Sequence, residues 1–177
     1  KKYVEDDYVG SMAYYTNDYP DLVNSPEEFV YYVPTNDIQT TYYDRDYANG
    51  YEADLILDPS AWDNSSYYMV FMCGDDKIVH IQTDCDNDRR LVIFKDSYGN
   101  ALVPCLTSSF SEIYVCDMRY FNLNAIDFIQ EEAKATDVLF CMNLFSANGP
   151  NGQDLEVVRT QNAAYDTSSW EDADTEF

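Results

Sequence analysis

The second half of the chain contains three short, continuous apolar runs, which are Leu91–Phe94, Glu112–Cys116 and Asp137–Met142. Runs of this length that are rich in branched and aromatic residues are typical of strands buried on both faces. We therefore expect three buried strands in this region.

The two segments between these runs have the features of helices. Ala101–Phe110 can form a helix, with Pro104 either in its first turn or kinking it. Asn124 can cap a second helix that continues through Lys134, with apolar residues at helical spacing. Alternating strands and helices predict an α/β fold, in which a parallel sheet with right-handed crossovers is flanked by helices.

The first half of the chain is less regular. Short β-like segments occur at Val30–Val33, Thr40–Tyr43, Ser65–Cys73 and Lys77–Gln82, separated by turn residues. We expect an irregular β-rich segment that precedes the parallel sheet within a single domain over residues 1–150. Residues 151–177 are polar and acidic and are predicted to form a tail.

Composition narrows the possible functions. Hydrophobic residues make up 46% of the chain, which is enough for a packed core, although the formal net charge is -23. This charge repels a phosphate backbone, so we expect no nucleic-acid partner. The sequence has no apolar run of the roughly 18 residues that a membrane span needs. It also starts without an apolar signal segment, which indicates either a cytosolic protein or a processed or truncated piece.

Neither the cysteines nor the acidic residues indicate a metal site or a cofactor. The five cysteines include no CxxC pair, and we expect Cys116 and Cys141 to be buried free thiols, with one disulfide possible in an exported protein. Asp84–Asp88 has the DxDxD spacing of a calcium loop. The sixth position is Arg89 and the twelfth is Lys95, so a solvated acidic turn is the better interpretation.

Polar residues follow each of the three predicted strands. Asp96 and Ser97 follow the first, Asp117 and Arg119 end the second, and Asn143 follows the third. Because ligands of parallel sheets bind beyond the carboxyl ends of the strands, this convergence predicts a site there.

Each of these residues has a structural alternative. Ser97, with Gly99 close behind, has the placement of a nucleophile at a strand-to-helix turn, but a serine there is often a helix cap. Asn143 can donate to an oxyanion or cap the next turn. Arg119 can hold a polar group or pair with Asp96 or Asp117, and we favour the ion pair.

Four stretches carry a resemblance to known proteins, and they are Leu91–Pro104, Ser111–Phe121, Thr136–Asn143 and Tyr8–Tyr14. The first looks like the KDSY/F-N-x-x-x-P segment of the DHHW family, whose members are related to the alginate-acetylation SGNH proteins of bacteria. The next two match that family in order and spacing, and Tyr8–Tyr14 is similar to its F-x-G-S-x-Y stretch. The resemblance is strong over residues 91–143 and weaker elsewhere.

This resemblance implies the carboxy-terminal part of an SGNH, flavodoxin-like domain at or outside the surface of a Gram-positive-type bacterium. It implies Ser97 as the nucleophile, the Ser97 N–H and the Asn143 side chain as oxyanion donors, and Arg119 near the pocket, with Asp96 beside Ser97. The D-x-H-W motif that carries the family's Asp and His is absent here. The chain's single histidine, His80, lies in a strand-like run and does not match the family's histidine.

Two functions follow from this interpretation. One is a serine esterase or acyltransferase for O-acetylated surface polysaccharide, inactive as this isolated chain because a missing amino-terminal segment or a second chain supplies Asp and His. The other is a non-catalytic binding, structural or self-assembly module, which the seventeen tyrosines also favour.

Overall fold

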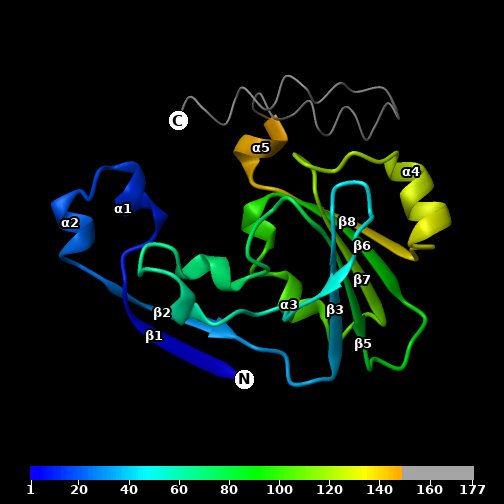
Figure 1. The fold of residues 1–177 in the computed structure, drawn as a ribbon, viewed down its shortest axis with the longest axis horizontal. Helices are drawn as coiled ribbons and strands as arrows, with labels where there is room; N and C mark the ends of the chain where they lie inside the picture. The colour runs from blue at the N-terminus through cyan, green and yellow to red at the C-terminus, as the bar shows by residue number, and fades with distance from the viewer. Residues whose placement is uncertain (149–177) are drawn as a thin grey trace.

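A six-stranded sheet organises residues 1–148, which are the part of the chain that the structure, a computed structural model, describes. Its strand order is β4-β3-β5-β7-β6-β8 (Figure 1). The three expected strands are β6 (Arg90–Lys95), β7 (Glu112–Asp117) and β8 (Asp137–Cys141), and they run parallel. β6 and β7 are buried as expected, but the burial predicted for the third strand is wrong, because β8 lies at the edge of the sheet with Val138 and Phe140 43% and 47% exposed. Because β6 lies between β7 and β8, the carboxyl ends of all three strands meet at one edge of the sheet.

The expectation of a parallel sheet is only partly right, because the sheet is mixed. β5 (Ile78–Thr83) is antiparallel to β7, β3 (Ile38–Tyr43) is antiparallel to β5, and the short β4 (Tyr51–Glu52) is antiparallel to β3. Only residues 84–89 separate β5 from β6. A crossover that keeps the strand direction needs roughly a dozen residues or more, so this loop reverses the chain instead.

The helices are shorter than the sequence predicts. α3 spans only Val103–Leu106 within the expected helix Ala101–Phe110. The carbonyl of Pro104 accepts the Thr107 hydroxyl at 3.0 Å, and the carbonyl of Thr107 accepts the Asn36 side chain at 3.1 Å. These side-chain donors replace the hydrogen bonds with which a longer helix would continue.

The second helix begins as predicted and then changes form. Asn124 caps α4 (Ala125–Asp127), since its side-chain oxygen accepts the N–H groups of Ile126 and Asp127. A π-helical turn, Phe128–Glu132, follows, and the chain leaves the helix at Lys134, whose φ is 47°. α5 (Leu144–Asn148) is the last element of the described residues.

The predicted strand Ser65–Cys73 is wrong. A 3₁₀ turn spans Tyr67–Val70, and a shorter one spans Pro59–Ala61. Val70 and Phe71 are buried in an aromatic cluster rather than in the sheet, so tertiary packing overrides the β-forming tendency of this run.

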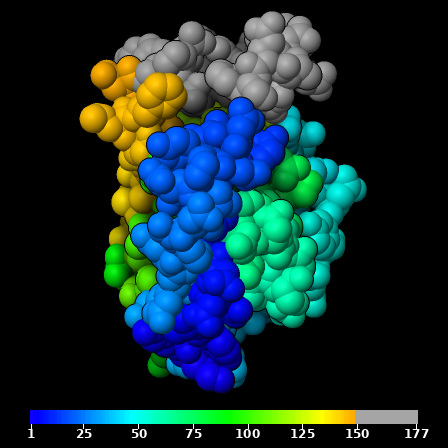
Figure 2. Space-filling model, turned by 90° about the vertical axis from the view of Figure 1, so that its left-hand side faces the viewer, coloured from blue at the N-terminus to red at the C-terminus, as the bar shows by residue number. Residues whose placement is uncertain are grey.

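That aromatic cluster packs a separate two-stranded layer against the segment that contains the 3₁₀ turns. β1 (Lys2–Tyr8) and β2 (Glu27–Tyr32) pair antiparallel, and α1 (Ser11–Tyr15) and α2 (Pro20–Val23) lie in their connection. The connection is much longer than a tight hairpin turn. Figure 2 shows this blue segment forming one flank of the molecule, beside the teal segment that contains the 3₁₀ turns.

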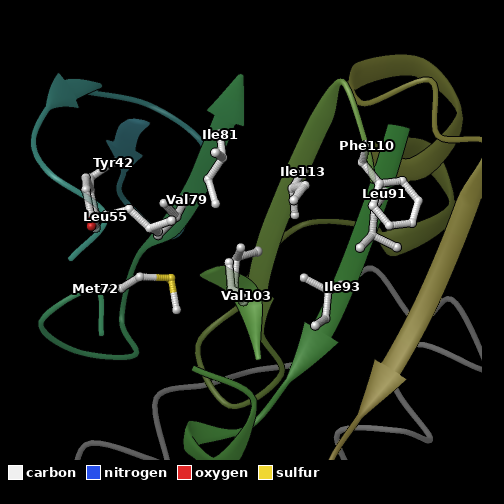
Figure 3. Close-up of a cluster of buried hydrophobic side chains, with 11 residues drawn as sticks. Tyr42, Leu55, Met72, Val79, Ile81, Leu91, Ile93, Val103, Phe110 and Ile113 are labelled. Atoms are coloured by element: carbon white, nitrogen blue, oxygen red, sulfur yellow. The ribbon is translucent and has the colours of Figure 1, made fainter. Parts of the chain in front are cut away.

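Apolar side chains cover both faces of the sheet. On one face they pack with residues of the loops and α3, as Figure 3 shows, and ten of them are labelled there: Tyr42, Leu55, Met72, Val79, Ile81, Leu91, Ile93, Val103, Phe110 and Ile113. On the other face, Phe94, Tyr114 and Cys116 pack against Phe128 from the π-helical turn. Val92, Ile93 and Phe94 are 0% exposed, which confirms that β6 is buried on both faces.

Cysteine usage agrees in part with the expectation. Cys116 is a buried free thiol as predicted, whereas Cys141 is only half-buried, and all five cysteines are unpaired. Within residues 1–148, no helix is both long and apolar enough to cross a bilayer. The predicted acidic tail, residues 151–177, lies outside the described residues.

Candidate functional site

Ser97 lies on a tight turn at the carboxyl end of β6. The carboxylate of Asp96 accepts the N–H of Tyr98 at 2.9 Å and so caps a 3₁₀ turn, Ser97–Gly99. Gly99 lies close to the end of β6, because an added Cβ would be 2.7 Å from the Cβ of Lys95, the last residue of that strand. A glycine is therefore required for the chain to fold back this closely after the strand.

The reactive groups of Ser97 are available. Ser97 is half-buried, and neither its N–H nor its hydroxyl forms a hydrogen bond with another residue of the described part of the chain. Its carbonyl is held instead, by the hydroxyl of Tyr68 at 2.9 Å. Asp96, rather than Ser97, is the cap, so the helix-cap alternative for Ser97 does not describe this turn.

Asn143 is tied to Asp96. The backbone N–H and the side-chain amide of Asn143 both donate to Oδ2 of Asp96, at 2.9 and 2.6 Å. The amide also donates to the hydroxyl of Ser146, and its oxygen accepts the Ser146 N–H at the start of α5. The structure therefore brings Asn143 next to the Ser97 turn, with its amide engaged and its capping role realised.

A buried ionic network lies beneath the turn. Nζ of Lys95 donates to Asp75 at 2.9 Å and to Asp117 at 3.0 Å, and both carboxylates also accept the Arg119 guanidinium at 2.8 Å. The side chains of Lys95 and Asp117 are 3% and 0% exposed. Two cations face two anions, so the network is neutral, as burial requires.

Arg119 forms the ion pair that the sequence analysis favours, with Asp117 but not with Asp96. Burial opposes its charge, yet the carboxylates of Asp117 and Asp75 outweigh burial and raise its pKa. Lys95, two residues before Ser97, directs its Nζ to the carboxylates of Asp75 and Asp117, so its hydrogen bonds belong to the buried network.

His80 lies in a different part of the sheet. It pairs with Tyr114 of β7, which pairs with Val92 of β6, so its level is three residues, or about 10 Å, before the end of β6. Its Nε2 is 3.0 Å from a Glu112 carboxylate oxygen, and its ring stacks on Tyr114 with 4.3 Å between centroids. Burial lowers the pKa of His80, against an opposing effect of Glu112.

The sequence analysis missed Asp75, Lys95 and Asn100 as parts of this region. Asp75 and Asn100 are joined by a hydrogen bond of 3.0 Å between residues 25 positions apart. The available signal was the turn sequence Gly74–Asp76, which marks a loop but does not give its partners. In residues 1–148 no group of three or more His, Cys, Asp or Glu side chains is arranged to hold a metal ion, including Asp84–Asp88.

The geometry thus defines a mixed α/β protein with a serine at the carboxyl end of a central parallel strand. Residues 1–116 match the family described as "DHHW protein", and the chain belongs to the DHHW family. This match includes Ser97 and ends before Asn143. No curated protein matches the chain.

Solved structures with a similar fold include a member of the same family. A DHHW family protein from Eubacterium siraeum is 43% identical, with a TM-score of 0.81, over 88% of this chain and 52% of its own. Bacillus cereus PatB1 with a sulfonyl adduct is 20% identical, with a TM-score of 0.61, over 81% of this chain and 46% of its own. A second PatB1 structure is 26% identical, with a TM-score of 0.55, over 67% and 40%. The chain thus spans about half the length of the first of these relatives.

Proposed function

We propose that this chain is the carboxy-terminal part of an SGNH-like serine esterase or acyltransferase that acts on O-acetylated surface polysaccharide outside a bacterial cell. The observation that carries the proposal is Ser97, whose N–H and hydroxyl are both unengaged within the described residues, at the carboxyl end of β6. The family membership supports it. The flavodoxin-like arrangement is proposed for the β6–β7–β8 part of the sheet.

The reaction begins with attack by Ser97 on the acetyl carbonyl carbon. A bond forms between the Ser97 oxygen and this carbon, and the serine proton passes to a base. The Ser97 N–H and the Asn143 side-chain amide donate to the oxyanion and stabilise it. For this, the Asn143 amide would give up its 3.1 Å hydrogen bond to the Ser146 hydroxyl. Asp96 fixes Asn143, and Arg119 faces a polar part of the substrate.

The ester bond to the sugar then breaks, and the sugar oxygen takes the proton from the base. Water completes an esterase cycle by attacking the acetyl-serine, and a hydroxyl of an acceptor completes a transferase cycle. The base comes from outside this chain, since the single histidine is held by Glu112 and Tyr114.

Chemical rescue tests the proposal on the chain as it exists. We would treat the protein with an aryl acetate, with and without imidazole as a surrogate base, and measure acetylation of Ser97 by peptide mass spectrometry. The expected result is imidazole-dependent acetylation at Ser97 that is absent in Ser97→Ala and unchanged in His80→Ala. Acetylation of other serines with none at Ser97 would reject Ser97 as the nucleophile. Loss of Ser97 acetylation in His80→Ala would make His80 the base.

A non-catalytic module is the second candidate, and a surface groove favours it. The groove has a volume of about 410 Å³ and is lined by Tyr8, Ser11, Met12, Asp21 and Glu27, among others. Aromatic and carboxylate side chains together suit the apolar faces and hydroxyl groups of sugars. Saccharide binding that survives Ser97→Ala, together with no acetylation of Ser97 under rescue, would favour this function.

A further inference from the structure

Asp75 connects both ends of the Ser97 turn. One carboxylate oxygen, Oδ1, accepts Nζ of Lys95 at 2.9 Å and the side-chain amide of Asn100 at 3.0 Å. Lys95 lies two residues before Ser97, and Asn100 lies three residues after it. A single oxygen atom therefore holds the residues that enter and leave the turn.

The other oxygen of the same carboxylate connects the turn to the next strand. Oδ2 of Asp75 accepts Nη2 of Arg119 at 2.8 Å, just beyond the end of β7. Arg119 also donates a hydrogen bond to Asp117, and the same Asp117 oxygen accepts a hydrogen bond from Nζ of Lys95. Through Asp75, the turn is fixed relative to two strands as well as closed on itself.

The backbone that delivers Asp75 is unusual. Met72, Cys73 and Gly74 have φ values of 63°, 49° and 124°, which places three consecutive residues in left-handed conformations. Such conformations are unfavourable for residues other than glycine and persist only where contacts on both sides hold them. Met72, only 2% exposed, is packed in the core before the bend, and Asp75 is held by three donors after it.

The charge of Asp75 suits this role. Burial on its own would raise its pKa, but Lys95, Asn100 and Arg119 together lower the pKa below the usual value. The carboxylate is therefore ionised at neutral pH and is the stronger kind of hydrogen-bond acceptor. Its two oxygens are occupied by cations and an amide of the network, which leaves it no contact with Ser97 itself.

We propose that Asp75 is a positioning residue for Ser97, because its carboxylate clamps Lys95 and Asn100 across the turn and keeps the Ser97 hydroxyl and N–H in one orientation. The proposal rests on the proposed function of Ser97. It concerns the geometry of the turn, since the hydrogen bonds that Asp75 accepts come from Lys95, Asn100 and Arg119.

The test compares Asp75→Asn with Asp76→Asn, which makes the same charge change one residue away, on a half-exposed side chain that pairs with Lys77. Asn100→Ala is the second variant, because it opens the clamp at the end of the turn and leaves all four charges of the network in place. Two readouts are followed, the imidazole-dependent rate of Ser97 acetylation and the hydrogen exchange of the peptide that contains the turn.

We expect Asp75→Asn and Asn100→Ala to slow Ser97 acetylation about tenfold or more at a saturating concentration of the aryl acetate, because a misplaced nucleophile loses reactivity rather than binding. Hydrogen exchange of the turn should rise in both variants, and Asp76→Asn should match the wild type in both readouts. Asp75→Glu, which keeps the charge, should recover part of the rate.

The outcomes separate this proposal from the proposed function. If the wild type itself is not acetylated at Ser97, the proposed function fails, and hydrogen exchange still decides whether Asp75 holds the turn. If Ser97 reacts in the wild type and Asp75→Asn reacts at the same rate with unchanged exchange, the positioning role is wrong. Reduced thermal stability with a normal rate in the folded fraction would likewise overturn it, since it would make Asp75 a purely structural residue.

Discussion

The two ends of β7 carry carboxylates in different surroundings. Asp117 at the carboxyl end is 0% exposed and accepts hydrogen bonds from Lys95 and Arg119. Glu112 at the start of the strand is 23% exposed and contacts His80, Arg90 and Tyr114. Both carboxylates are fully partnered, but only Asp117 is removed from water. The comparison separates the effect of burial from the effect of pairing on one strand.

Burial determines how much stability is lost when the carboxylate of Asp117 or of Glu112 is removed from among its partners. Water can replace a lost partner around Glu112, because that side chain reaches the surface. Around Asp117 the cation of Lys95, 3% exposed, would lose half of its compensation with no water to replace it. The end of the strand that carries the candidate site is thus the end where charge changes are least tolerated.

The largest effect is expected from neutralising the buried carboxylate. Asp117→Asn should lower the free energy of unfolding by about 3–5 kcal/mol, because Lys95 and Arg119 then share only Asp75. Glu112→Gln, the matched change at the other end of β7, should lower it by about 1 kcal/mol or less. Urea unfolding measures both. Equal losses in the two variants would show that pairing matters and burial does not.

An intermediate effect is expected from filling the space above Lys95. The Cβ added by Gly99→Ala would be 2.7 Å from the Cβ of Lys95, so the turn or the strand end must shift. We expect a loss of about 1–3 kcal/mol, as for other overpacked sites. Ser97→Ala, in the same turn, is the control and should leave stability nearly unchanged. Thermal unfolding of the two variants would contradict this account if Gly99→Ala were as stable as the wild type.

The smallest effect concerns pH and the contacts of His80 with Glu112 and Tyr114 near the start of β7. Burial lowers the pKa of His80 below its ordinary value of 6.5, so the unfolded chain binds a proton there more readily than the folded chain. The contribution of neutral His80 is therefore fully present above pH 6.5 and is lost as the pH falls through the folded pKa. His80→Gln should remove this part of the pH dependence. The loss at more acidic pH, where paired carboxylates such as Asp75 take up protons, should remain in the variant.

Local pattern was enough to predict the elements that depend on burial along a single segment. The runs that form β6, β7 and β8 are mainly apolar, and their polar ends meet because the strands are parallel. The pattern did not predict that β8 is an edge strand with Val138 and Phe140 exposed, because its neighbours are set by the order of the strands. The cap at Asn124 was also predictable, since its partners are two and three residues away.

The sequence was less informative where distant residues decide the structure. Ser65–Cys73 has the composition of a strand, but Val70 and Phe71 pack with Phe29 and Tyr31 of β2, and its β-pairing is confined to one bridge between Phe71 and Ile56. Asp75 finds partners 20, 25 and 44 residues further along the chain, which no local pattern contains. The roles of Ser97, Asn143, Asp96 and Arg119 stay predictions that the experiments above test.

The central position of β6 also determines at which stage of unfolding the candidate site is disrupted. Both edges of β6 are hydrogen-bonded, to β7 and β8, and its middle residues are fully buried. Amide groups in such a strand exchange with solvent only through the largest unfolding events, whereas a small peripheral layer such as β1–β2 opens at lower free energy. A protease that removes the β1–β2 layer would therefore leave a fragment in which the Ser97 turn still stands on an intact strand.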